Sequence, residues 1–369
     1  MKINFDKSEV YTMGVTEEDQ QEVTRVLNCK MGSFPMKYLG MPVSDCKITK
    51  AQFKYVSDKA EKRLGTWQCD YLSSGGRSIL IESCLSAIPI YTMGVYQLYE
   101  GNYQTIDSIR SRFYWQGTSK KCKYHMIKWE ALSRPKEARG LGFMDVRAMN
   151  ISLLAKWIDR LGREDNNICC NLLRKKYLGE KSIFQIRSRQ GSQFWRSLLG
   201  IRKWFQRGRI IQVVSGRQTR FWQDCWLGEC PLKVLFPNIF SIALHPDLDV
   251  YQAFTEGQWR VLFRRQLQGI YGAEWEQLQE MLIEVNLGVG RDKMFWALEQ
   301  SRKYTSGSLY RAITFGGVRD QRLMNVWKCN IPLKVKIFIW MAAHDRIQSR
   351  VQLKKKQWSG RRNVLLVIV

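Results

Sequence analysis

Apolar side chains recur every three or four positions from residue 46 to about residue 160, and this spacing constrains the fold more than any other feature of the chain. One such series would form a single helix face and comprises Phe53, Val56, Ala60 and Leu64. Similar series predict helices around residues 79–88, 106–113 and 151–158. The glycine pair in residues 73–76 breaks the pattern. The spacing therefore predicts a bundle of helices with short breaks.

Residues 1–45 differ from this bundle because they predict short strands and turns. A helix is expected to begin near Thr16 and to run through Leu27, since a threonine cap followed by acidic residues suits a helix N-terminus. Residues 38–43 predict a strand that ends in a turn. The expected fold class is mainly α, with a small α+β remnant at the N-terminus.

The chain is strongly basic, with 59 Lys and Arg against 33 Asp and Glu and a formal net charge of +26. A charge of this size repels itself unless a polyanion or strong cores offset the repulsion. Nucleic acid is the leading partner, because neutralising many phosphates releases many counterions. A membrane surface is the second choice, and a basic surface that only keeps the chain soluble is the alternative.

Basic and aromatic residues are interleaved between residues 170 and 222, where 13 Lys or Arg face one acid, Glu180. Charge beside flat rings is what a surface needs to follow a nucleic-acid backbone and stack on bases. The alternative is that the rings are core and the charges are the solvated face of the same elements; for the rings alone, that alternative is favoured. The candidate phosphate contacts are Arg77, Lys175, Lys176, Arg202, Lys203, Arg207 and Arg209, and the candidate stacking residues are Trp195 and Trp204.

Strands are expected within part of this basic stretch. Residues 210–214 and 219–222 are rich in β-branched and aromatic residues and flank Gly216, which predicts a hairpin. Residues 231–290 are closer to charge balance and predict helices separated by loops, and residues 291–360 predict a further unit.

No arrangement of catalytic or metal-binding side chains stands out. Acid–base or two-metal chemistry needs carboxylates or imidazoles brought together, whereas the acidic cluster at residues 17–19 suits a helix start. The ten cysteines include no C-x-x-C and the three histidines are scattered, so no catalytic residue, metal or cofactor is expected. Reduced thiols and the lack of a long apolar segment favour the nucleus or the cytoplasm over secretion or a membrane. The oligomeric state stays open.

Several strings that occur in one order resemble a known family. The most specific is LSSGGRSILIESCLSAIPIY at residues 72–91, followed by GLGFMDVRAMNISLLAKW at residues 140–157. The others are KINFDKSE at 2–9, YLGMPV at 38–43, RLGTW at 63–67, FYWQG at 113–117, FWQDCWLG at 221–228 and WKCNIPLKVKIFIWMA at 327–342. Together they resemble the C-terminal half of plant non-LTR (LINE-type) retrotransposon reverse transcriptases, which include ribonuclease H-like copies.

The resemblance implies an order of domains. Residues 1–45 would be a remnant of the polymerase palm, and residues 46–165 a thumb-like helical domain that holds the template–primer duplex. Residues 166–290 would be a basic, aromatic-rich connecting region, and residues 291–360 a truncated reverse-transcriptase zinc-binding domain. Residues 361–369, RRNVLLVIV, fit no pattern and would be an aberrant tail.

Two departures from the family pattern decide the functional expectation. The catalytic Phe/Tyr-Ala-Asp-Asp turn would precede Lys2 and the zinc-binding Cys-x-x-Cys would follow Gly360, and neither motif occurs in the sequence. The expectation is therefore a non-catalytic fragment of a reverse transcriptase that binds RNA or DNA and holds no zinc. Two alternatives stay open: a part that acts in trans with a separate palm as an RNA-directed DNA polymerase, and an inert product of a decayed element.

Overall fold

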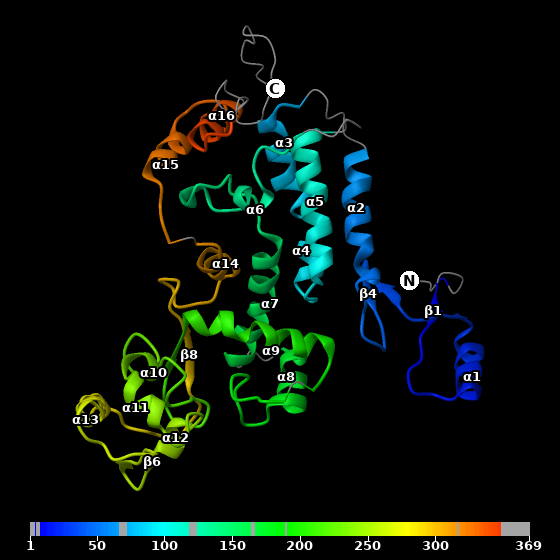
Figure 1. Ribbon diagram of the computed structural model, residues 1–369. Coiled ribbons are helices and arrows are strands. Elements are labelled where there is room, and N and C mark those ends of the chain that lie inside the picture. The colour runs from blue at the N-terminus through cyan, green and yellow to red at the C-terminus, as the bar shows by residue number, and fades with distance from the viewer. Residues whose placement is uncertain are drawn as a thin grey trace.

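The structure, a computed structural model, describes residues 4, 8–65, 72–117, 124–163, 167–188, 190–315 and 317–347 of the 369-residue chain (Figure 1). Helices predominate in these ranges, and the strands form four separate pairs. The expected fold class, mainly α with small sheets, is confirmed. Over the same ranges, no helix combines the length and the apolar character that a membrane span requires.

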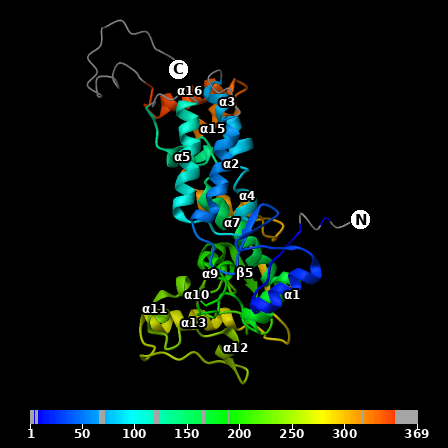
Figure 2. The ribbon, with the colours of Figure 1, turned by 90° about the vertical axis from the view of Figure 1, so that its right-hand side faces the viewer.

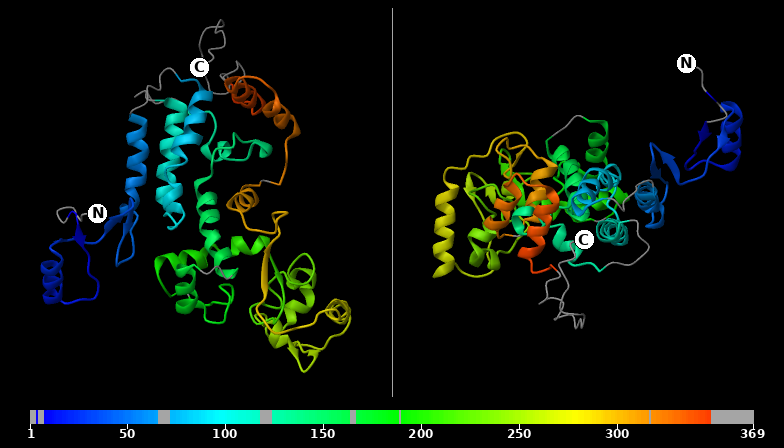
Figure 3. Two further views of the ribbon diagram at one scale, coloured as in Figure 1. Left: turned by 180° about the vertical axis from the view of Figure 1, so that it is seen from behind. Right: turned by 90° about the horizontal axis from the view of Figure 1, so that it is seen from above.

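The N-terminal part stands to one side of the other elements (Figure 3). Strand β1 (Glu9–Val10) pairs in parallel with β2 (Lys30–Met31), and helix α1 (Glu17–Leu27) connects them. The Thr16 hydroxyl accepts a hydrogen bond from the Asp19 amide at 3.3 Å, so the expected helix and its cap are confirmed.

Residues 38–43 were expected to form one strand that ends in a turn. They instead form the turn and the second strand of a hairpin. Strand β3 (Met36–Tyr38) pairs antiparallel with β4 (Met41–Val43). Leu39 and Gly40 between them have φ of 49° and 81°, values in the left-handed region that reverse the chain. The turn therefore lies in the middle of the apolar string rather than at its end.

The expected helical bundle is confirmed over the next hundred residues (Figures 1 and 2). Its helical segments are η2 (Ala51–Phe53), α2 (Lys54–Gly65), α3 (Ser74–Leu80), η4 (Ile81–Leu85), α4 (Ile90–Met93), α5 (Glu100–Gln116), α6 (Trp129–Leu132), η5 (Lys136–Ala138) and α7 (Val146–Gly162). Helix α5 packs on α2 and α3. The expected separation of two helices is present, but the second begins at Ser74 and not after the glycines: the Ser73 hydroxyl accepts from the Gly76 amide at 3.3 Å, and both glycines lie inside α3.

A second group of helices follows α7 and carries the basic stretch. It begins with α8 (Ile168–Leu173), η6 (Arg174–Leu178), α9 (Gln193–Phe205) and η7 (Gln206–Gly208). It continues with β5 (Arg209–Gln212), α10 (Leu232–Leu235), α11 (Pro237–Ile242), α12 (Val250–Ala253), β6 (Phe254–Thr255), β7 (Gln258–Trp259), α13 (Ile270–Leu282) and β8 (Lys293–Trp296). Helices separated by loops were expected over residues 231–290, and the structure confirms them.

The hairpin expected around Gly216 is wrong. Strand β5 pairs antiparallel with β8, so that Arg209 lies opposite Trp296 and Gln212 opposite Lys293. The chain cannot return along β5 at Gly216, because the Gly216 amide donates to the Asp292 carboxylate at 2.9 Å. Phe221 and Trp222, which would have formed the return strand, are fully buried in a separate core.

The last described helices pack back on the bundle. Helices α14 (Ser306–Thr314), α15 (Gln321–Lys328) and α16 (Leu333–Ala343) contact α7, η5 and α3 respectively. Trp340 shares a buried cluster with Ile81 and Phe113, and its indole N–H donates to the Arg139 carbonyl at 3.0 Å. Residues beyond 290, expected as a further unit, thus contribute to the core of the helical bundle. The expected aberrant tail at 361–369 lies outside the described residues.

Candidate functional site

Four of the expected phosphate contacts lie on the surface of the second helical group. Lys175 and Lys176 are exposed on η6. Lys203, at the end of α9, and Arg207, on η7, are exposed on the same face and flank the half-buried Trp204. The Lys203 ammonium lies 5.8 Å and the Arg207 guanidinium 4.4 Å from the centre of the Trp204 ring. We call Lys203, Trp204 and Arg207 the basic ridge.

The structure does not support Trp195 as a stacking residue. Its side chain is 1% exposed and lies in the core below α9. One face of the indole is already covered by Tyr177, at 4.6 Å between ring centres and 9° between ring planes. An aromatic ring can stack on a base only if one of its faces is open to solvent, so Trp195 is a core residue.

The side chains of Arg209 and Arg202 are buried or half-buried and bind other groups of the protein. Arg209 is 4% exposed, lies over the Phe184 ring at 3.7 Å and pairs with the buried Asp224 at 2.5 Å. Burial lowers the pKa of the Arg209 guanidinium, and Asp224 opposes that shift. The half-buried Arg202 donates to the carbonyls of Ile183 and Ile186 at 3.1 and 2.6 Å. Neither side chain is placed as an exposed phosphate contact, because the protein itself uses their donors.

Arg77 also forms a hydrogen bond within the protein. It lies inside α3, half-buried, and its Nη1 donates to the Tyr114 carbonyl at 3.2 Å. Tyr114 belongs to the last turn of α5, whose final carbonyls have no partner within the helix. Arg77 therefore helps to cap α5 and does not extend toward a phosphate.

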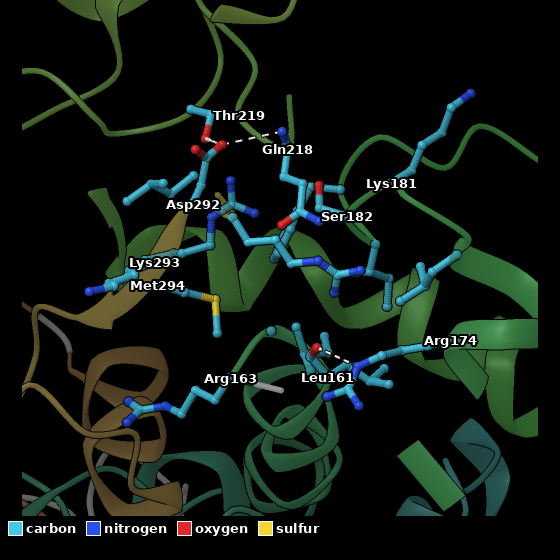
Figure 4. Close-up of a pocket in the computed structure, with 18 of the residues that line it drawn as sticks. Leu161, Arg163, Arg174, Lys181, Ser182, Gln218, Thr219, Asp292, Lys293 and Met294 are labelled. Carbon is cyan, nitrogen blue, oxygen red and sulfur yellow. Dashed lines mark hydrogen bonds between the residues drawn. The ribbon is translucent and has the colours of Figure 1, made fainter. Parts of the chain in front are cut away.

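One cavity among the described residues is a basic pocket of about 630 Å³ (Figure 4). It lies where the end of α7, η6 and the segment after it, β5, β8 and the loop at residues 218–219 meet. Its charged lining residues are Arg163, Arg174, Lys181, Arg209, Arg291, Lys293 and a single acid, Asp292. We refer to this cavity as the basic pocket.

The Asp292 carboxylate is held in place by the loop at residues 214–219. Oδ1 accepts from the amides of Val214, Ser215 and Gly216 at 2.8, 3.0 and 2.9 Å. Oδ2 accepts from the Thr219 hydroxyl at 2.6 Å and from the Gln218 amide at 3.2 Å. Backbone N–H groups that converge on one anion are typical of a nest, and here the protein supplies the anion.

The cations of the pocket differ in how far the protein already pairs them. Arg163 pairs with Asp159 at 2.7 Å. Burial raises the pKa of the Asp159 carboxyl, and Arg163 opposes that shift. Arg291 has a loose contact of 3.9 Å with the exposed Glu180. Within the described residues, Lys181 and Lys293 are exposed and have no carboxylate at ion-pair distance. The pocket therefore keeps an excess of positive charge.

Most of the residues that line the basic pocket are not among the candidate residues predicted from the sequence. Lys181 and Arg174 lie in the basic stretch, but Arg163 comes from the end of α7 and Lys293 from β8. These positions are far apart along the chain. No local signal in the sequence could have joined them, since the pairing of β5 with β8 brings them together.

A family model described as zinc-binding in reverse transcriptase matches residues 304–366. This segment contains one cysteine and one histidine, Cys329 and His344. Cys329 donates to the Asn325 carbonyl at 3.2 Å, and His344 Nδ1 lies 2.8 Å from the Trp340 carbonyl. In the described ranges, no group of three or more His, Cys, Asp or Glu could hold a metal ion. A structural zinc takes four ligands, so the cysteine and histidine of this segment do not fit a closed zinc site.

Two relatives come from Arabidopsis thaliana. The chain is 26% identical over 341 residues to a protein named as a ribonuclease H protein, and the match covers 87% of this chain and 52% of that protein. It is 30% identical over 152 residues to an uncharacterized mitochondrial protein, and the match covers 40% of this chain and 99% of that protein. The chain spans about half the length of the longer relative. It belongs to the reverse-transcriptase-related proteins of retrotransposon type and corresponds to their C-terminal region.

Proposed function

We propose that this chain binds RNA or DNA as the C-terminal region of a LINE-type reverse transcriptase and does not itself polymerise nucleotides. The observation that carries the binding proposal is the basic pocket together with the basic ridge. Both are lined by Lys and Arg side chains, and Lys181, Lys293 and Lys203 are exposed. Exposed cations of this kind contact phosphates without reading the base sequence.

The buried carboxylates support the second half of the proposal. Asp224 and Asp292 are the buried acids of the described residues, at 1% and 9% exposure. Asp224 pairs with Arg209 and accepts from the Arg220 amide at 2.9 Å, and Asp292 accepts from one loop. Two-metal phosphoryl transfer requires acidic side chains directed at shared cations. Both acids instead have a structural role.

A binding titration tests the proposal. Fluorescence anisotropy with labelled single-stranded and duplex oligonucleotides should show binding whose affinity falls with salt. The double variant Lys203→Glu/Arg207→Glu should weaken binding about tenfold and reduce the salt dependence, because it removes about two phosphate contacts. The matched control is Lys128→Glu/Lys334→Glu, at exposed positions of the helical bundle, which changes the net charge equally. Equal losses in both variants would assign the binding to net charge alone.

Primer extension tests the absence of polymerase activity. Purified protein with a primed template, Mg²⁺ or Mn²⁺ and labelled nucleotides should incorporate no label. Metal-dependent incorporation by this chain would contradict the proposal, and incorporation that requires an added palm polypeptide would favour the trans-acting alternative.

A further inference from the structure

We propose that the basic pocket holds one nucleotide unit of a single-stranded nucleic acid, so that the chain prefers single strands to duplexes. This inference rests on the proposed function and specifies its ligand class. It goes beyond binding by net charge, because it assigns one unit of the ligand to one cavity.

The size and shape of the cavity are the first argument. Its volume of about 630 Å³ lies in the range of pockets that enclose a small molecule, about 300–1,000 Å³. A duplex presents its phosphates on the outside and keeps its bases paired, so it cannot place a nucleotide in a pocket unless one is flipped out. Flipping a nucleotide out of a duplex breaks its base pair and its stacking, whereas a single strand can turn one nucleotide outward without breaking a base pair.

The chemistry of the lining is the second argument. Leu161, Met294 and Phe295 provide apolar contact area of the kind that a base needs. Figure 4 shows Arg163, Lys181 and Lys293 on different sides of the pocket, with Met294 among them. A cationic rim around an apolar interior matches a nucleotide, which joins a charged phosphate to a flat, largely apolar base.

The pairing of the pocket's charges is the third argument. The carboxylate of Asp292 is held by the loop at residues 214–219, and its one negative charge faces six Lys and Arg side chains in the pocket lining. The two lysines of the rim, Lys181 and Lys293, have no ion pair within the described residues. Two exposed ammonium groups without an ion pair at the rim of one cavity attract a phosphate, since a local excess of positive charge raises the concentration of anions there.

The first experiment compares two charge-matched double variants on two probes. The pocket variant is Lys181→Glu/Lys293→Glu, and the control is Lys128→Glu/Lys334→Glu. The probes are a labelled single-stranded 12-mer, as oligo(dT) and as oligo(rU), and a 12-base-pair duplex at one salt concentration. The pocket variant should lose about tenfold more single-strand affinity than the control, and both should lose the same duplex affinity. Oligo(dT) and oligo(rU) distinguish DNA from RNA as the source of the strand.

A second variant blocks the pocket without changing its charge. Met294→Trp places a larger side chain in the cavity and should lower the single-strand affinity at least fivefold, while the duplex affinity stays at the wild-type value. Thermal unfolding checks that the variant remains folded. If it does not fold, the charge variants still decide the inference, because Lys181 and Lys293 are exposed.

The outcomes separate this inference from the proposed function. Wild-type protein that binds neither probe contradicts the proposed function itself. Wild-type protein that binds both probes, with equal losses in the pocket and control variants, leaves the proposed function standing and overturns the pocket inference.

Discussion

The Asp292 carboxylate accepts a hydrogen bond of 2.6 Å from the Thr219 hydroxyl and so ties the start of β8 to a loop 73 residues earlier in the chain. The same carboxylate accepts from three consecutive amides, including that of Gly216. Thr219 is fully buried and Asp292 is 9% exposed, so water cannot replace these bonds readily. The interaction holds one wall of the basic pocket, because both residues line it.

Removing this carboxylate should destabilise the protein. Asp292→Ala leaves several buried donors without an acceptor, and we expect a loss on the order of 3 kcal/mol in the free energy of unfolding. Guanidinium unfolding measures the loss. Asp247→Ala is the matched control, because Asp247 forms an exposed ion pair with Arg187 and should change stability by no more than about 0.5 kcal/mol. Equal effects at both sites would show that the loop bonds are dispensable.

Trp340 should anchor the C-terminal helices to the bundle. It is fully buried and its indole N–H donates to the Arg139 carbonyl. We expect Trp340→Ala to lower the free energy of unfolding by about 3–5 kcal/mol, since a cavity replaces a large core side chain. Limited proteolysis should then cut near α15 and α16 before the rest of the chain. Phe315→Ala, at a side chain that is 47% exposed, should leave both readouts near wild type.

Substitutions of the two tryptophans of α9 should have different effects, one on stability and the other on nucleic-acid binding. Trp195 lies in the core, so Trp195→Phe should lower the melting temperature and leave the affinity for single strands unchanged. Trp204 lies beside the ridge cations, so Trp204→Ala should weaken that affinity by about 1 kcal/mol or more, as the loss of a base-stacking ring does. Anisotropy titrations and thermal melts on both variants measure the two effects. A Trp195 variant that folds normally but binds less tightly would contradict the assignment.

Asp159 should make stability depend on pH. Burial raises the pKa of its carboxyl above the ordinary value, against the opposing effect of Arg163. A carboxyl of this kind stabilises the fold fully below its unfolded pKa of about 4, and the contribution is lost as pH rises through the higher folded-state pKa. The difference in unfolding free energy between wild type and Asp159→Asn should therefore fall as pH rises from about 4 to 7. A difference that rises or stays constant over that window would contradict the sign.

The helices were predictable because their signals are local. The period of Val56, Ala60 and Leu64 lies within α2, and the Thr16 cap acts within three residues. The net charge and the basic stretch at residues 170–222 likewise follow from composition. These features indicated a helical protein with a polyanionic partner, since propensity, capping and charge depend on neighbours along the chain.

Tertiary packing decided which basic and aromatic residues remain on the surface. Trp195 and Trp204 lie on opposite faces of α9, and packing against the core decides that the face of Trp195 is buried, at 1% exposure, whereas Trp204 lies beside exposed cations. The β5–β8 pairing displaced the expected hairpin and brought Lys293 to the same cavity as Lys181. Burial and pairing between distant segments depend on how whole elements fill space, and a residue's sequence neighbours do not encode that arrangement.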